Sequence, residues 1–190
     1  NQVSTIAKNN NCRLHLDGAR IFNAAVALDI DIRDLVNDVD SVTFCLSKGL
    51  SSPVGSVICG DNDFIKRVRH IRKALGGGMR QTGIISAAGI VSLDTMTSRL
   101  KDDHANAKHL AKSLCTLKGI ELNPKLVPTN IIYFNFNHPE MSSGELVSYM
   151  KSKGIIFSDY NGKHCRLVTH HGICSDDIEN VIDVFNKLLS

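Results

Sequence analysis

A chain of 190 residues, 43% of them hydrophobic, is long enough to bury a sizeable core in one large domain or two small ones. Its formal net charge of +3 is small and argues against a nucleic-acid-binding surface. The six cysteines are scattered without metal-ligand spacing. The scattered cysteines, and a sequence that shows neither a membrane-spanning run nor a signal peptide, lead us to expect a reducing compartment, most simply the cytoplasm.

Short apolar segments alternate with helix-like segments in the first part of the chain. Strands are predicted over residues 12–16, 41–46 and 54–59, and a helix with an Ala-rich face is predicted over 19–29. This alternation predicts an α/β layer with a largely buried sheet.

A basic run over residues 66–73 carries apolar residues at helical spacing inside it. We interpret it as the solvated face of a helix that Asp61 caps and that ends at the glycines 76–78. Its apolar positions are Phe64, Ile65, Val68 and Ile71.

Residues 81–118 are compatible with a helix throughout and contain no proline, so they form one long helix or two in series. The apolar pattern lapses near 97–102, where we place a domain boundary. The predicted domains are therefore residues 1–98 and 99–190.

The second half has the pattern of a compact α+β domain. Apolar and polar residues alternate over 132–136, as in a half-buried strand. The other predicted elements are a helix that Ser142 opens and Gly154 closes, strands over 155–157 and 164–168, and a last helix that Ser175 caps.

One lysine and one aspartate stand where pyridoxal 5′-phosphate (PLP) chemistry would need them. PLP requires a lysine to hold its aldehyde, an acid facing the ring nitrogen, and cations for anionic groups. Lys48 lies in a turn after an apolar run, and Asp17 ends an earlier strand. Each also has a simpler interpretation, because a Lys-Gly turn can be merely solvated and Asp17 can cap a helix or pair with Arg20.

Four motifs in order carry a family resemblance over nearly the whole chain. The sequence resembles the low-specificity L-threonine aldolases, within the aspartate-aminotransferase-like (fold type I) PLP enzymes. The fold implied is the C-terminal part of a PLP-binding large domain over 1–98 and a small α+β domain over 99–190. The motifs are His15-Leu16-Asp17-Gly18-Ala19-Arg20, Ser47-Lys48-Gly49-Leu50 with Pro53-Val54-Gly55-Ser56, Gly76-Gly77-Gly78-Met79-Arg80-Gln81, and Arg166-Leu167-Val168-Thr169-His170.

The resemblance implies roles for matching residues. Lys48 would bind PLP covalently and Asp17 would contact the pyridine nitrogen. Arg20 and Arg166 would hold the substrate carboxylate, which suits the planar fork of a guanidinium. Ser51-Ser52 stand where the family commonly has Gly-Ala.

Lys73 and Arg80 would lie near the cofactor, within the subunit or across a subunit interface. The resemblance also implies a homo-oligomer, a dimer or a tetramer, of the full-length chain. His170-His171 raise the question of a metal, but adjacent strand residues point to opposite faces, so we expect no metal site there.

The implied reaction is cleavage of L-threonine or L-allo-threonine to glycine and acetaldehyde. Two alternatives stay open: another PLP-dependent β-eliminating lyase, or a non-catalytic truncated homologue. The chain starts with Asn and lacks the family's N-terminal motifs, so we expect it to be about half of such an enzyme and inactive alone.

Overall fold

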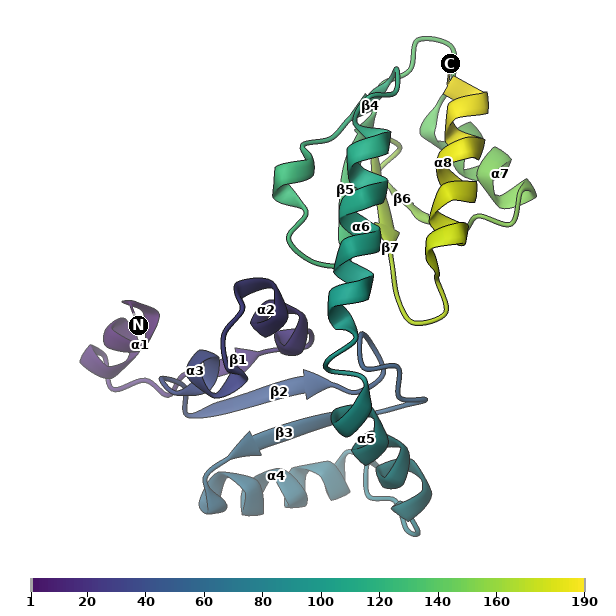
Figure 1. Ribbon diagram of the computed structural model, residues 1–190. Coiled ribbons are helices and arrows are strands. Elements are labelled where there is room, and N and C mark those ends of the chain that lie inside the picture. The colour runs from purple at the N-terminus through teal and green to yellow at the C-terminus, as the bar shows by residue number, and fades with distance from the viewer. Residues whose placement is uncertain (1, 190) are drawn as a thin grey trace. The chain divides into compact units, whose positions relative to one another are not determined.

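The computed structural model describes residues 2–189. The chain divides into two compact units, one up to Ser98 and the other from Arg99 onward. Each unit is described by itself below (Figure 1).

The first unit contains a sheet of three short strands in the order β1-β2-β3. Strands β1 and β2 run parallel, with Asp17 opposite Thr43, whereas β2 and β3 are antiparallel. The elements of this unit are α1 (Gln2–Asn9), β1 (His15–Asp17), α2 (Ile21–Leu28), α3 (Ile32–Val36), β2 (Ser41–Cys45), β3 (Ser56–Gly60), α4 (Asn62–Ala74) and α5 (Gly83–Thr95).

The strands of this unit are shorter than predicted, for local reasons. The backbone N–H of Leu14 donates to the Asp40 carboxylate at 2.8 Å, and the Leu14 carbonyl accepts from the N–H groups of Asp40 at 2.9 Å and Ser41 at 3.3 Å. Leu14 is therefore bonded to the residues where β2 begins, and β1 starts only at His15. Strand β3 begins only at Ser56, because Gly55 has a φ of +107° that interrupts the extended backbone. The short helix α3, capped by Asp31, was not predicted.

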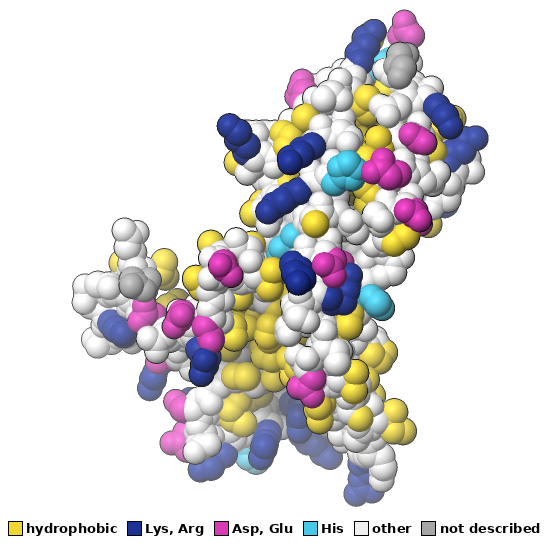
Figure 2. Space-filling view, viewed as in Figure 1, with side chains coloured by type: hydrophobic (Ala, Val, Ile, Leu, Met, Phe, Trp, Pro, Cys, Tyr) yellow, Lys and Arg dark blue, Asp and Glu magenta, His cyan; other side chains and the backbone are white. Residues whose placement is uncertain are grey.

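Helix α4 confirms the prediction for the basic run. Asp61 accepts a hydrogen bond from the backbone N–H of Phe64 at 2.7 Å, and the helix ends before the glycines. A Cβ at Gly60 would lie 2.5 Å from the Phe64 ring, so glycine is what lets this ring approach strand β3. Figure 2 shows Lys and Arg side chains along α4.

Residues 81–118 form two helices in series, α5 and α6 (Leu100–Leu114). The second unit continues with an antiparallel sheet in the order β4-β5-β7-β6. Its remaining elements are β4 (Ile120–Glu121), the 3-10 helix η1 (Pro124–Leu126), β5 (Ile131–Phe136), α7 (Ser143–Ser152), β6 (Ser158–Tyr160), β7 (His164–Val168) and α8 (Ser175–Leu189).

One face of this second sheet carries the core. Ile132 and Phe134 of β5 and Leu167 of β7 are buried, and the neighbouring residues of each strand face the other way. Helices α6 and α8 lie side by side and contribute Leu110 and Phe185 to the same cluster (Figure 1).

Two predictions for the second unit were wrong in detail. No strand forms over 155–157, because the N–H of Ile155 bonds to the carbonyl of Met150 and closes α7; the strand starts at Ser158. Ser175 is the first residue of α8 and not its cap. Asp177 makes the capping contact, accepting from the N–H of Cys174 at 2.9 Å. The cap of α7, in contrast, is a capping box of Ser142 and Glu145.

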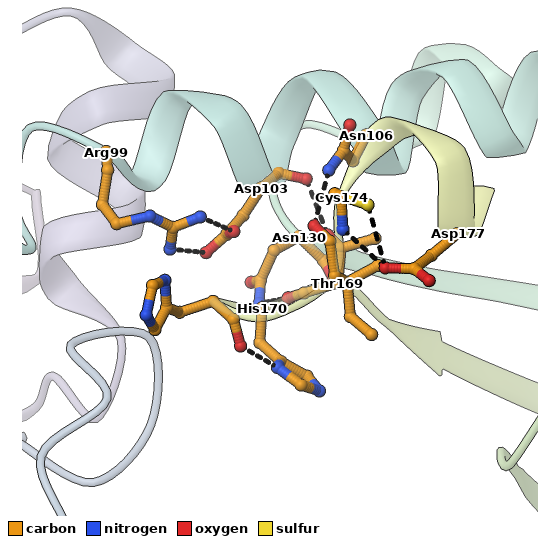
Figure 3. Close-up of polar contacts among 10 residues, drawn as sticks. Arg99, Asp103, Asn106, Asn130, Thr169, His170, Cys174 and Asp177 are labelled. Carbon is orange, nitrogen blue, oxygen red and sulfur yellow. Dashed lines mark hydrogen bonds and ion pairs between the residues drawn. The ribbon is translucent and has the colours of Figure 1, made fainter.

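A buried polar network fixes the segment that follows β7 (Figure 3). The Thr169 hydroxyl donates to the carbonyl of Asp103 at 2.6 Å, and the Asn130 amide donates to the carbonyl of Thr169 at 2.8 Å. Asp103 is fully buried and pairs with Arg99 at 2.8 Å. The end of β7 is thereby tied to α6 and to the start of β5.

His170 and His171 lie beyond the end of β7 and not in a strand, so the prediction that placed them on a strand was wrong. The Nδ1 of His170 contacts the carbonyl oxygen of His171 at 2.7 Å (Figure 3). Across residues 2–189, no helix has the length and apolar character needed to cross a membrane.

Candidate active site

Asp17 and Lys48 lie at the same edge of the first sheet. Asp17 is the last residue of β1, and Lys48 comes three residues after the end of β2. The pairing continues past the strands, because Gly18 donates to the carbonyl of Thr43 at 2.8 Å and Cys45 donates to that of Ala19 at 3.3 Å. Since β1 and β2 are parallel, the sheet brings the carboxylate and the lysine to one carboxyl edge.

A tightly bonded loop presents Lys48. The N–H of Ser51 bonds to the carbonyl of Lys48, and that of Ser52 to the carbonyl of Leu46, both at 3.0 Å. Leu50, 2% exposed, anchors the loop, while the Lys48 side chain is exposed. Ser51 has a φ of +57°, in the left-handed region that favours glycine.

Asp17 and Arg20 line one pocket of about 390 Å³, together with Gly18. The Asp17 carboxylate accepts from the N–H of Ala19 at 3.2 Å and so also holds the turn into α2. A Cβ at Gly18 would lie 3.1 Å from the carbonyl oxygen of Thr43, a tight contact that glycine avoids. The pocket therefore pairs an anionic group with a cationic group.

Lys73 and Arg80 lie on either side of the glycine run. Lys73 is in the last turn of α4, and a Cβ at Gly78 would lie 2.9 Å from its Cδ. The run thus folds back against the Lys73 side chain, and Gly76 allows this with a φ of +81°. Both cations are exposed, and neither lines the pocket of Asp17 and Arg20.

Arg166 belongs to the second unit, in the middle of β7. It lies between Tyr133 of β5 and Ser158 of β6, on the face of the sheet away from the core. Its guanidinium carbon is 6.0 Å from the centre of the Tyr133 ring. Its Nε is buried and has no hydrogen-bond partner among residues 2–189.

These donors fit PLP. Within the first unit, a lysine amine and a carboxylate share one sheet edge, and the guanidinium of Arg20 lines the carboxylate's pocket. An acid, an amine and cations are what the cofactor and an amino-acid carboxylate require.

The sequence did not point to Tyr133. Its alternation with Ile132 and Phe134 placed it on the polar face of its strand, but no local signal linked it to Arg166. The link depends on the register between β5 and β7, which only the structure supplies.

Comparison with known proteins agrees with these observations. Residues 1–137 match the family model described as beta-eliminating lyase. The chain is 41% identical over 188 residues to a probable low-specificity L-threonine aldolase of Arabidopsis thaliana, covering 98% of this chain and 53% of the relative. It is 39% identical over 171 residues to the low specificity L-threonine aldolase of Escherichia coli K12, covering 90% of this chain and 49% of the relative.

The chain thus spans about half the length of the curated relatives it matches. A crystal structure of a putative L-allo-threonine aldolase from Listeria monocytogenes aligns with 99% of this chain and 55% of its own, with a TM-score of 0.82 at 18% identity. This likeness confirms the expected fold. The match over 1–137 covers well over half of the sequence, and the chain belongs to the beta-eliminating lyase family.

Proposed function

We propose that the full-length protein containing this chain cleaves L-threonine and L-allo-threonine to glycine and acetaldehyde. The observation that carries the proposal is the shared carboxyl edge of the parallel strands β1 and β2, where Asp17 ends β1 and Lys48 comes three residues after β2. The similarity to proteins named low-specificity L-threonine aldolases supports this substrate class.

The cofactor of the family and of related fold type I enzymes is PLP. When bound, PLP supplies a ring that accepts the electron pair left at Cα when a bond to that carbon breaks. In our proposal Lys48 would hold its aldehyde carbon. Asp17 would keep the proton on the pyridine nitrogen, because an adjacent carboxylate favours the cationic form of the ring.

Arg20 and Arg166 would bind the substrate carboxylate. A guanidinium offers two parallel donors to a carboxylate, which fixes its orientation as well as its position. The half-buried Arg166, with its unused Nε donor, supports this role. A carboxylate held in one orientation also fixes the orientation of the substrate, and this orientation decides that the Cα–Cβ bond is the one that breaks.

Lys73 and Arg80 would act near the cofactor, within one subunit or from a neighbouring one. Exposed apolar side chains flank them, namely Ile71, Leu75, Met79 and Ile84, and such a patch supports a homo-oligomer. In the full-length protein, 1–98 would be the C-terminal part of the PLP-binding domain and 99–190 the small domain. The free cysteines fit a cytoplasmic location.

The test uses the purified full-length protein with PLP and each of the two threonine isomers. We expect glycine and acetaldehyde in equal amounts, a raised KM in Arg20→Lys and Arg166→Lys, and no turnover in Lys48→Ala. Unchanged substrate affinity in both arginine variants would refute the carboxylate assignment. The 190-residue chain alone should be inactive, so turnover by it would contradict our view that the remaining half is required.

The family match also favours a second candidate, a β-eliminating lyase that acts on aromatic amino acids or cysteine conjugates. Incubation with a substrate that carries a β-leaving group separates the two. Pyruvate and ammonia from that substrate, without cleavage of allo-threonine, would support elimination and contradict aldol cleavage.

A further inference from the structure

Tyr133 and Arg166 are direct cross-strand neighbours in the second sheet. β5 and β7 pair antiparallel with these two residues opposite each other. Their side chains share the face away from the core, and the guanidinium carbon lies 6.0 Å from the ring centre. At that distance a cation is attracted by the face of an aromatic ring.

Among the contacts of the Arg166 guanidinium, the one that can orient it is the ring of Tyr133. Its Nε is buried and makes no hydrogen bond within residues 2–189, and no ion pair to it is found there. A long side chain without such a partner has several rotamers open to it. The ring of Tyr133 removes some of them by occupying one side of the guanidinium.

Tyr133 does not contribute to the hydrophobic core of the second unit. Its side chain is 61% exposed, and its strand neighbours Ile132 and Phe134 make the buried contacts. It also lines an open groove of about 600 Å³ with Tyr160 and His164, so a smaller side chain leaves no sealed cavity. A substitution here therefore tests the contact with Arg166 and not the packing of the domain.

We propose that Tyr133 is a positioning residue that holds the Arg166 guanidinium ready for the substrate carboxylate through the face of its ring. The inference rests on the proposed function, in which Arg166 binds that carboxylate. The hydroxyl of Tyr133 has no part in it, because the attraction comes from the ring and not from a hydrogen bond.

The test measures ligand binding by calorimetry on the full-length, PLP-loaded protein. The ligands are glycine and ethanolamine, an amine without the carboxylate. Loss of a partly exposed cation–ring contact should weaken glycine binding about two- to fivefold in Tyr133→Ala and Tyr133→Leu. Tyr133→Phe should bind glycine as the parent does, and ethanolamine binding should stay unchanged in every variant.

The matched control is Tyr160→Ala, which removes a second exposed tyrosine of the same groove that is not opposite Arg166. It should leave glycine binding unchanged. In kinetics, Tyr133→Leu should raise the KM for threonine with little change in kcat, whereas a loss of folded protein would lower the apparent kcat alone.

The variant Arg166→Lys distinguishes the carboxylate-binding role of Arg166 from the positioning role of Tyr133. If it leaves glycine binding unchanged, the carboxylate assignment fails and this inference fails with it. If Arg166→Lys weakens glycine binding but Tyr133→Ala and Tyr133→Leu do not, only the positioning role is overturned. An equal loss in Tyr133→Phe would also overturn it, because the hydroxyl would then be the essential group.

Discussion

The two units of this chain differ in how completely they bury their own apolar side chains. The second unit contains one contiguous core between its sheet and the helices α6 and α8. In the first unit, α4 has no fully buried residue, and Leu75 and Ile84 are 81% and 86% exposed. Figure 2 shows hydrophobic side chains on the surface of α5.

The unit with the more complete core is not the unit that contains the proposed PLP-binding residues. The second unit has the buried area that a stable domain needs. The first unit contains Asp17 and Lys48, but its apolar faces are of the kind that pack against further protein. Its site would therefore be completed by surfaces that the first unit does not supply itself.

The largest expected effect comes from separating the units. Residues 99–190 expressed alone should unfold in a single cooperative thermal transition, because their core is contiguous and internal. Residues 1–98 alone should show no such transition and should aggregate or bind a hydrophobic dye. Circular dichroism on both pieces checks this, and a sharp transition in 1–98 would remove the contrast between the units.

Truncating a core ring should show the same contrast within the 190-residue chain on its own, in which Ile84 is 86% exposed. Phe185 is fully buried and packs against Phe134 with ring centres 6.4 Å apart. Phe185→Ala should lower the free energy of unfolding by about 3–5 kcal/mol. The control, Ile84→Ala on exposed α5, should change it by less than about 0.5 kcal/mol. Urea denaturation measures both, and equal losses would contradict the assignment of the core to the second unit.

The sequence predicted elements whose signals are local. Asp61 and Ser142 marked helix starts correctly, and the lapse near 97–102 marked the break between α5 and α6. It failed where a hydrogen bond that the apolar pattern does not reveal decides where a strand begins. The N–H of Leu14 bonds to the Asp40 carboxylate just before β1, and the bond from Ile155 to Met150 closes α7 and delays β6 to Ser158.

The residues of the candidate site also differ in whether the sequence alone could predict them. Lys48 and Asp17 could be named from their motifs, because each follows an apolar strand and the order of the motifs is distinctive. The pairing of Tyr133 with Arg166 could not, because it depends on the register of two strands separated by helix α7.

A smaller effect is expected from pH. His104 is 5% exposed, and burial lowers its pKa from the ordinary value of 6.5. At a pH below about 6.5 the unfolded chain protonates His104 more readily than the folded chain does, so the free energy of unfolding should fall as the pH drops below that value. Melting temperatures between pH 7.5 and 5 should show this decline in the parent.

The matched variants are His104→Gln and His70→Gln, the second at an exposed position of α4. The decline should be weaker in His104→Gln and unchanged in His70→Gln. A decline of the same size in all three proteins would mean that His104 does not cause it.

The most direct test of the account is to locate the cofactor on the chain. The full-length protein should be loaded with PLP, reduced with borohydride, digested and mapped by mass spectrometry. The account predicts a pyridoxyl group on Lys48, and a loss of that label at limiting PLP in Asp17→Ala. A label on another lysine, such as Lys73, with Lys48 unmodified would contradict it.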